Sequence, residues 1–325
     1  MRPVVGRIRP GHDEQLASGR ASNADDEFYT PLFEIEHGLA PYLDRLRGAR
    51  ILLNTNDGQW SMFWQYLTGR FHELGLREVV SMEYNPDHGT LFAQPGDTGR
   101  LHHYDGQRMW VEDTHDSGGF DAPSGLDALR HTDVVLGNPP FTRLHDYVPL
   151  LLATPVDWLI VANIHCVLYS RILPAFIQGQ VRVRAGNGGM WFRLPEGRTA
   201  HARMRRVDTD GRPMVRVTNT GWLTNMPTEP AVFTPTHRYD PHTNPLYDTI
   251  DAVDAASRNL IPCDWVGRVG APVSILNRWP AGYRPIGMLS TGHGPLDHGA
   301  PMVQGRALYK RILIEPGPWP GVLEQ

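Results

Sequence analysis

The tetrapeptide Asn138-Pro139-Pro140-Phe141 is the part of this sequence best suited to chemistry, because it can hold a planar amino group. It follows a short apolar run that ends in Gly137, a pattern that indicates the end of a buried strand. Two consecutive prolines fix the backbone and remove two N–H donors, so the loop offers carbonyl oxygens. The Asn138 side chain and the Pro139 carbonyl can accept hydrogen bonds from one exocyclic NH2 group. The Phe141 ring can then stack on the base that carries this group.

Such a loop is typical of methyl transfer from S-adenosylmethionine to an amino group. The acceptor could be adenine N6, cytosine N4 or a glutamine amide. The alternative interpretation is a plain turn between a strand and a helix, since Asn-Pro often begins turns.

Polar residues that follow the other predicted strands could bind the cofactor, because ligands of open α/β sheets lie beyond the carboxyl ends of the strands. Asp57, in a polar turn that lacks the usual Gly-x-Gly pattern, is placed to accept a hydrogen bond from an ammonium group. Glu83 ends the next predicted strand, where an acid commonly binds a ribose. The alternative is that these residues cap helices or form surface turns. The candidates from the strand ends are Asn54, Asn56, Asp57, Glu83 and Asp121, the last expected near the cofactor adenine.

Strands and helices alternate as far as about residue 178, which predicts an α/β fold with a doubly wound, mostly parallel, Rossmann-like methyltransferase sheet. The expected strands cover residues 50–54, 78–84, 133–136 and 158–162. The expected helices begin near Pro31 and cover residues 61–74, 123–130, 147–152 and 170–178. Residues 186–221 alternate arginine with apolar residues around turn signals, so antiparallel strands are expected there.

These patterns predict three parts of the chain. Residues 1–24 are polar and irregular and are expected to form a flexible N-terminal arm. Residues 25–180 are expected to form the cofactor-binding catalytic domain. Residues 181–325 are expected to form a partly β target-recognition region, with C-terminal elements that pack back on the catalytic domain.

The composition is that of an ordinary globular protein, with 325 residues, 41% of them hydrophobic and 20% charged. No apolar run approaches the length that spans a membrane, and no secretory signal is recognisable at the N-terminus. Two distant cysteines, Cys166 and Cys263, form neither a disulfide framework nor a zinc site, so a reducing cytoplasm is expected. The histidines lack the spacing of a metal site, and no metal is expected.

Arginine is concentrated in residues 181–216, which hold nine arginines and three acids, a local balance of +6 in a chain of net charge −4. Arginine makes forked contacts to phosphates and guanine edges that lysine cannot make. We therefore expect a DNA-binding segment, although a solvated surface hairpin would have the same composition. The candidate DNA-binding residues are Arg182, Arg184, Arg193, Arg203, Arg205 and Arg206.

The sequence resembles the EcoRI-type adenine-specific DNA methyltransferases, a family that depends on S-adenosylmethionine. Several blocks occur in the same order over roughly residues 25–315: Asp26-Glu27-Phe28-Tyr29-Thr30, Leu53-Asn54-Thr55-Asn56-Asp57, Asp133-Val134-Val135 with the tetrapeptide, Gly221-Trp222-Leu223-Thr224-Asn225-Met226, Ile261-Pro262-Cys263-Asp264-Trp265 and Tyr309-x-Arg311-Ile312-Leu313-Ile314. The trailing blocks are the more specific signal, because many amino methyltransferases share the tetrapeptide. The sequence departs from the family at Gly119-Phe120-Asp121, where the family has Gly-Asp-Phe.

The resemblance implies an enzyme that methylates N6 of a flipped-out adenine at specific sites in double-stranded DNA. It implies that Phe28, Tyr29 and Thr30 lie against the cofactor methionine. A monomer is expected, either beside a separately acting restriction endonuclease or as an orphan or phage modification enzyme. The alternatives are methylation of cytosine N4, of RNA or of protein glutamine, and a non-catalytic nucleic-acid-binding protein of the same fold.

Overall fold

A computed structural model describes residues 29–55, 58–90, 94, 96–185, 188–194, 205–208, 210–292 and 294–322. The predicted N-terminal arm lies outside the described residues. Four predicted site residues also lie outside them: Phe28, Asn56, Asp57 and Arg203.

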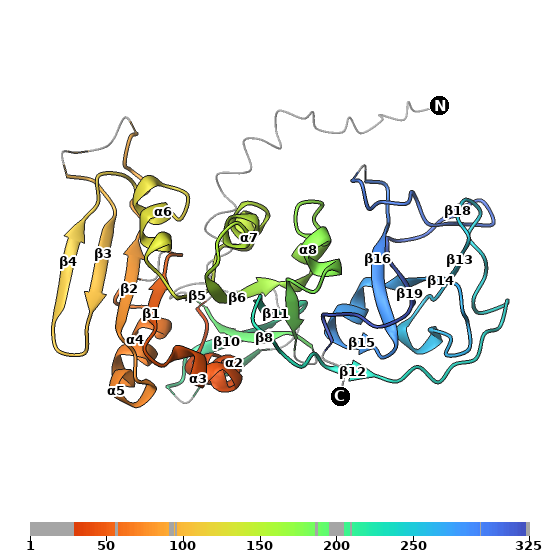
Figure 1. The fold of residues 1–325 in the computed structure, drawn as a ribbon, viewed down its shortest axis with the longest axis horizontal. Coiled ribbons are helices and arrows are strands. Elements are labelled where there is room, and N and C mark those ends of the chain that lie inside the picture. The colour runs from red at the N-terminus through yellow and green to blue at the C-terminus, as the bar shows by residue number, and fades with distance from the viewer. Residues whose placement is uncertain are drawn as a thin grey trace, which may run out of the picture.

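An eight-stranded sheet has the spatial order β4-β3-β2-β1-β5-β6-β11-β7. In Figure 1 it runs from β4 at the left end of the molecule to β6 and β11 in the middle. Its four central strands are parallel neighbours: β2 (Glu78–Glu83), β1 (Arg50–Leu53), β5 (Val134–Gly137) and β6 (Asp157–Asn163). Antiparallel pairings extend both edges, with β3 (Arg100–Tyr104) and β4 (Met109–Asp113) on one side and β11 (Thr220–Thr224) and β7 (Arg182–Arg184) on the other. In this sheet β3 and β11 run against the other six strands, so the prediction of a mostly parallel sheet is confirmed.

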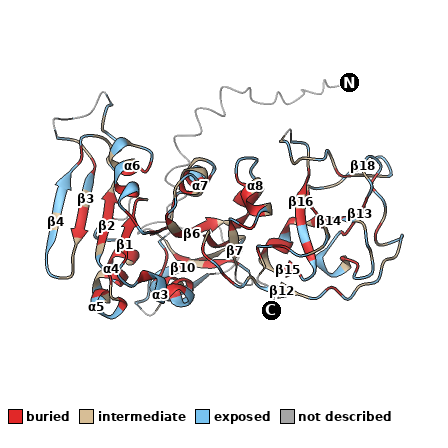
Figure 2. Cartoon of the chain, viewed as in Figure 1, coloured by how far each residue is buried: buried red, intermediate tan, exposed pale blue. Residues whose placement is uncertain are grey.

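Helices cover both faces of this sheet, because successive residues of a strand point to opposite sides. In β1, Leu52 joins one hydrophobic cluster, while Ile51 and Leu53 join the other. The face of Leu53 is covered by α2 (Leu32–Leu39), η1 (Ala40–Tyr42), α3 (Leu43–Leu46), α4 (Met62–Gly69) and α5 (Phe71–Leu74). The face of Leu52 is covered by α6 (Pro123–Arg130), α7 (Leu144–Leu152) and α8 (Leu173–Ile177). Figure 2 shows the buried residues gathered in the central strands and on the helix sides turned toward them.

The segment 61–74, predicted as one helix, forms two. The Ser61 hydroxyl accepts a hydrogen bond from the Trp64 N–H and starts α4, but the helix ends at Gly69, and Arg70 leaves the helical conformation before α5 begins. Glycine is a poor helix former, which explains the break at this point. The apolar residues continue across it on one buried face, so their spacing predicted a single helix.

The central sheet extends beyond the predicted domain boundary at residue 180. Both β7 and β11 follow this boundary in the sequence, and they pair in the order β6-β11-β7. The physical reason is that β6 would otherwise leave an open sheet edge, which the returning chain covers with backbone hydrogen bonds.

The predicted antiparallel strands after residue 186 are confirmed as a small sheet, β8-β10-β9. These strands are β8 (Met190–Arg193), β9 (Arg205–Val207) and β10 (Pro213–Val217). A four-stranded sheet follows, in the order β13 (Ala252–Asp254), β14 (Arg268–Pro272), β19 (Arg311–Pro316) and β16 (Tyr283–Leu289). Short elements complete the described chain: β12 (Val232–Phe233), β15 (Trp279–Pro280), β17 (Met302–Val303), β18 (Arg306–Ala307), η2 (Phe141–Arg143), η3 (Ile164–Leu168), η4 (Arg258–Leu260) and η5 (Val273–Asn277).

Three aromatic rings join the C-terminal part to the central sheet. Phe176 of α8 lies 5.9 Å from the Trp279 ring and 4.9 Å from the Trp319 ring, and the two tryptophan rings are 4.5 Å apart. All three side chains are buried, and the Trp319 indole donates a hydrogen bond to the Ile177 carbonyl. The C-terminal part and the central sheet therefore share one hydrophobic core.

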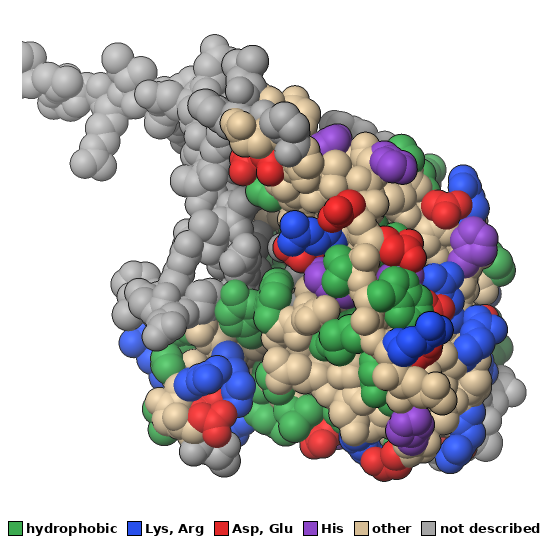
Figure 3. Space-filling view, turned by 90° about the vertical axis from the view of Figure 1, so that its left-hand side faces the viewer, with side chains coloured by type: hydrophobic (Ala, Val, Ile, Leu, Met, Phe, Trp, Pro, Cys, Tyr) green, Lys and Arg blue, Asp and Glu red, His purple; other side chains and the backbone are tan. Residues whose placement is uncertain are grey.

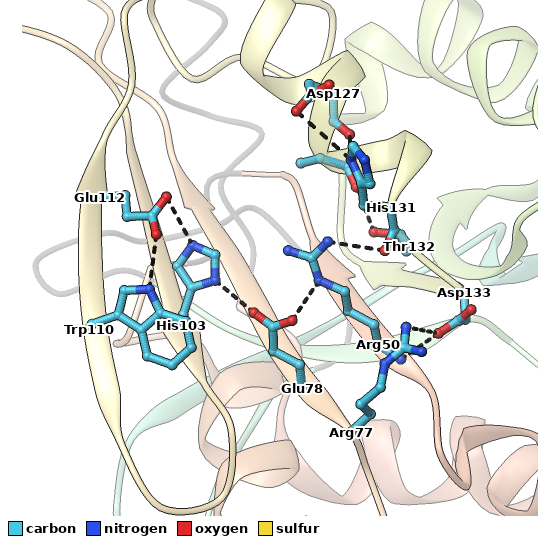
Figure 4. A network of polar contacts seen from close by, with 11 residues as sticks. Arg50, Arg77, Glu78, His103, Trp110, Glu112, Asp127, His131, Thr132 and Asp133 are labelled. Carbon is cyan, nitrogen blue, oxygen red and sulfur yellow. Dashed lines mark hydrogen bonds and ion pairs between the residues drawn. The ribbon is translucent and has the colours of Figure 1, made fainter.

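A polar network connects the amino ends of β1 and β2 to the hairpin that β3 and β4 form at the sheet edge (Figure 4). The Glu78 carboxylate lies 2.8 Å from Arg50 Nε and 2.8 Å from His103 Nδ1. The His103 ring stacks on Trp110, with 4.8 Å between the centroids, and its Nε2 lies 3.9 Å from a carboxylate oxygen of Glu112. Arg50 and Glu78 are the first residues of β1 and β2, so this network lies at the end of the sheet opposite the predicted site.

Acidic, basic and hydrophobic side chains are interspersed on the side of the molecule nearest β4 (Figure 3). The exposed fractions of Met109 and Val111, both in β4, are 50% and 47%. This side therefore carries no large surface of one charge.

Within the described ranges, no helix is long and apolar enough to cross a bilayer, and no group of three or more His, Cys, Asp or Glu side chains could hold a metal ion.

Candidate active site

Three of the predicted catalytic and cofactor residues lie at the carboxyl edge of the central strands. β1 and β5 are neighbours in space, while β2 lies on the other side of β1, so the order of the strands reverses between β1 and β5. Ligands of open α/β sheets bind at such a point. Asn54 follows β1, Glu83 ends β2 and Asn138 follows β5, which brings three predicted side chains to this one edge.

The tetrapeptide forms a short, stiff loop between β5 and η2. Asn138 is partly exposed, Pro139 is buried and Pro140 is exposed. The Pro140 carbonyl accepts the Arg143 N–H at 2.9 Å, which closes the first turn of η2. The Phe141 ring is partly buried and lies edge-on to Phe192, with 6.5 Å between the centroids. The loop thus carries a polar side chain and an aromatic ring just after the carboxyl end of β5.

The two polar atoms of the buried Asn54 amide differ in their hydrogen bonding. Its Oδ1 accepts a hydrogen bond from the hydroxyl of Tyr147 on α7. Its Nδ2 has no hydrogen-bond partner among the described residues, although Asn54 is only 2% exposed. Because an unsatisfied buried donor is costly, this group is suited to a ligand acceptor.

Glu83 belongs to a chain of three polar side chains. Gln59 Nε2 lies 3.2 Å from His102 Nδ1, and His102 Nε2 lies 2.8 Å from Glu83 Oε2. If the Gln59 amide donates to Nδ1, the neutral imidazole carries its proton on Nε2 and donates it to Glu83. One carboxylate oxygen is then held by His102, and the other could accept a hydrogen bond from a ligand hydroxyl.

Asp121 contacts the loop that follows the tetrapeptide. Its carboxylate lies 2.9 Å from a guanidinium nitrogen of Arg143, and Arg143 lies 4.9 Å above the Phe120 ring. Phe120 in turn packs edge-on against Tyr147, with 4.8 Å between the centroids. The structure therefore gives Asp121 an ionic partner within the protein and links it to α7.

The N-terminal block is held at the small sheet. The backbone of Tyr29 exchanges two hydrogen bonds with that of Arg193 in β8, at 3.2 and 2.9 Å. The Tyr29 ring lies edge-on to Trp60, with 5.8 Å between the centroids. Thr30 is buried, and its hydroxyl has no hydrogen-bond partner among the described residues.

Three of the predicted DNA-binding arginines bind groups of the protein itself. Arg182 donates to the carbonyls of Asn225 and Pro320. Arg184 donates to the carbonyls of His37 and Gly38, and burial lowers the pKa of both guanidinium groups. Arg193 forms ion pairs with two nearby aspartates, at 2.6 and 3.2 Å.

The remaining described candidates, Arg205 and Arg206, are exposed on β9. The Arg206 guanidinium lies 4.2 Å from the Trp191 ring centroid and 4.8 Å from that of Phe33. Aromatic rings that stack on a guanidinium leave its N–H groups pointing outward in the plane of the fork. Arg206 is therefore preorganised to donate to a phosphate or a base edge.

The family model described as "Adenine-specific methyltransferase EcoRI" matches residues 17–315 of the chain. The chain belongs to the EcoRI family of adenine-specific methyltransferases. It is an enzyme of that class, and the predicted family is confirmed.

Three curated relatives match this chain over most of its length. Type II methyltransferase M.MpnI of Mycoplasma pneumoniae is 29% identical, over 91% of this chain and 97% of the relative. Type II methyltransferase M.EcoRI of Escherichia coli is 25% identical, over 89% and 93%. Type II methyltransferase M.MgeORF184P of Mycoplasma genitalium is 23% identical, over 86% and 88%. No solved structure matches the chain significantly.

The hydrogen-bonding groups of Asn54, Thr30 and Glu83 fit S-adenosylmethionine, the methyl donor that the family implies. The cofactor offers acceptor oxygens to the Asn54 and Thr30 groups that have no partner among the described residues, and hydroxyl donors to the second carboxylate oxygen of Glu83. Asn54 and Glu83 lie at the carboxyl edge of the sheet, and Thr30 follows Tyr29, whose ring contacts Trp60 in the segment after β1.

Sequence patterns did not identify five further residues around the site: Gln59, His102, Phe120, Arg143 and Tyr147. Arg143 could have been found, since it lies two residues after the tetrapeptide. Tyr147 and Asn54 are 93 residues apart, and no local pattern marks that contact.

Proposed function

We propose that the chain is a site-specific DNA adenine N6-methyltransferase that uses S-adenosylmethionine. The observation that carries this proposal is the position of Asn138-Pro139-Pro140-Phe141 beside Asn54, where the order of the strands reverses. Membership of an adenine-specific family supports adenine as the base, and the exposed arginines of β9 support DNA as the polymer.

We propose double-stranded DNA as the substrate and the cytoplasm as the place of the reaction. An adenine stacked in a duplex cannot reach the carboxyl edge of the sheet, so it has to leave the stack at a cost of a few kcal/mol. We propose that the partly exposed Phe141 ring receives the flipped base by stacking. Arg205 and Arg206 would hold the adjacent backbone.

Asn138 and Pro139 would act on the adenine amino group directly. The Asn138 side-chain oxygen and the Pro139 carbonyl would accept hydrogen bonds from the two N6–H groups, which would orient the nitrogen and turn its lone pair toward the methyl donor. S-adenosylmethionine, when bound, supplies the methyl group as an electrophile. Asn54, Thr30, Glu83 and Tyr29 would position the donor, and positioning of this kind supplies much of the rate of a two-substrate reaction. The extra N6 proton leaves to water after transfer.

The biological setting proposed is DNA modification by a monomer. The relatives are named Type II methyltransferases, which supports a role beside a separately acting restriction endonuclease. An orphan or phage-borne modification enzyme would use the same site.

Methyl transfer to unmethylated genomic DNA tests the proposal, with labelled S-adenosylmethionine and mass spectrometry of the nucleosides. Asn138→Ala should abolish the product, while Asn259→Ala, an exposed position in η4, should leave it unchanged. The proposed reaction and loop are supported if the wild type and Asn259→Ala form N6-methyladenine and Asn138→Ala does not. Product only on RNA, or product undiminished in Asn138→Ala, would overturn it.

A further inference from the structure

The Asn54 side chain is an amide whose two ends differ in chemistry, so its function depends on which way it faces. The oxygen accepts hydrogen bonds and the NH2 group donates them. Asn54 directly follows β1, the strand beside which the strand order reverses. Rotation of the amide by about 180° would present an acceptor to the ligand in place of a donor.

Tyr147 binds the oxygen end of this amide. Its hydroxyl donates to Asn54 Oδ1, which turns Nδ2 away from α7. Tyr147 is fully buried, and Phe120 packs edge-on against its ring at an interplanar angle of 69°. A buried ring confined in this way cannot easily move its hydroxyl, so the hydrogen bond is a rigid one.

The described part of the fold does not use the group that Tyr147 turns away. Nδ2 is buried and has no hydrogen-bond partner among the described residues. A hydrogen bond made only to stabilise the fold would gain little by leaving the other half of the same amide unsatisfied, because that half carries a desolvation penalty. A ligand atom that accepts a hydrogen bond from Nδ2 would satisfy this donor and explains the arrangement better.

We propose that Tyr147 is a positioning residue for the cofactor. It holds the Asn54 amide so that Nδ2 donates to an acceptor oxygen of S-adenosylmethionine. The inference rests on the proposed function for the identity of the ligand. It adds a residue from α7, directly after the catalytic loop, to the cofactor site.

The chain offers a matched control for this proposal. Tyr42 is also a buried tyrosine, 2% exposed, but its hydroxyl has no hydrogen-bond partner among the described residues. It packs on the opposite face of the sheet from Tyr147. Tyr42→Phe and Tyr147→Phe therefore remove the same atom from a buried ring, and only the second change frees Asn54.

The test is calorimetric binding of S-adenosylhomocysteine to the full-length protein, with thermal unfolding of each unliganded variant. Tyr147→Phe should weaken binding about 10-fold, which corresponds to the loss of one oriented hydrogen bond. Tyr42→Phe should bind like the wild type. Asn54→Asp keeps an acceptor for the Tyr147 hydroxyl but loses the donor, and it should weaken binding at least as much. Asn54→Leu with Tyr147→Phe should bind no more weakly than Asn54→Leu alone, because Tyr147 acts through Asn54.

The outcomes separate this inference from the proposed function. Wild-type affinity in Tyr147→Phe, or a further loss when it is added to Asn54→Leu, would overturn the positioning role and leave the proposed reaction standing. No binding of S-adenosylhomocysteine by the wild type would overturn the proposed cofactor and the positioning role together. If Tyr147→Phe does not fold, Asn54→Asp decides, since wild-type affinity in that variant also contradicts the inference.

Discussion

Side chains at the carboxyl edge of the sheet differ in how much of their hydrogen-bonding capacity the fold has already used. Arg143 is committed to Asp121, while Asn54 keeps a buried donor and Glu83 keeps one carboxylate oxygen. Groups that the fold leaves unsatisfied are the ones available to a ligand, because a satisfied group would have to break a contact first. We therefore propose that Asn54, whose buried donor is unsatisfied among the described residues, contacts the cofactor.

Phe141 is expected to contribute to turnover through its ring. Phe141→Ala should lower kcat/KM for DNA about 10- to 100-fold, since base stacking on an aromatic ring contributes about 1–3 kcal/mol. Phe141→Tyr keeps the ring and should stay within about threefold of the wild type. Single-turnover methyl transfer would measure both variants, with S-adenosylhomocysteine binding as the control for folding. Equal rates for the alanine and tyrosine variants would contradict a stacking role.

The two cysteines are expected to differ in reactivity. Burial raises the pKa of the Cys166 thiol to about 12, whereas Cys263 is exposed. At pH 8 a disulfide reagent should therefore modify one thiol in the native protein and two after denaturation. Between pH 9 and 12 the unfolded state loses the Cys166 proton and the folded state keeps it, so this group lowers stability as the pH rises. Two fast-reacting thiols in the native protein would contradict the burial of Cys166.

At the scale of elements, the sequence predicted what depends on local periodicity. The helix 123–130 and the four central strands follow from apolar runs bounded by turn residues, and the structure places them within one or two residues. The break at Arg70 was missed because the apolar face continues across it. Arg182 and Arg184 were predicted on the DNA surface, yet they bind backbone carbonyls. Their partners are long-range ones, which no local charge pattern can reveal.

The network at the amino ends of the strands should matter for stability and not for ligand binding. Glu78→Gln removes the charge shared by Arg50 and His103 and should lower the free energy of unfolding by about 2 kcal/mol, less than the 3–5 kcal/mol typical of fully buried pairs. Urea denaturation would measure this change. Glu73→Gln, in an exposed pair with Arg70, should have no measurable effect. A loss of S-adenosylhomocysteine affinity in Glu78→Gln would contradict the separation of this network from the site.

β8 and β9 together present the stacked Arg206, so DNA binding should depend on this pair of strands. Arg206→Ala should weaken DNA binding several-fold and reduce the slope of log affinity against log salt by about 1, the effect of one lost phosphate contact. Trp191→Ala should weaken binding less, because the charge stays while its orientation is lost. Fluorescence anisotropy at several salt concentrations would measure both. Arg258→Ala, an exposed arginine in η4, is the control and should behave like the wild type.

At the scale of the whole molecule, the shared core implies that the catalytic sheet and the C-terminal part unfold together. Phe176 belongs to α8 of the sheet layer, while Trp279 and Trp319 come from the C-terminal part, so the predicted boundary at residue 180 crosses one packed cluster. A domain boundary with few contacts would allow two separate transitions, whereas a continuous core favours a single one.

Trp319→Ala tests this coupling directly. Truncation of a buried tryptophan should lower the free energy of unfolding by about 3–5 kcal/mol. If the core is continuous, calorimetry will show one transition that moves to lower temperature as a unit. S-adenosylhomocysteine, which would bind only the sheet, should then raise the temperature of that same transition, because ligand binding to one part stabilises everything that unfolds with it. Two transitions, of which the ligand moves one and Trp319→Ala the other, would show that the catalytic sheet is stable without its C-terminal neighbour.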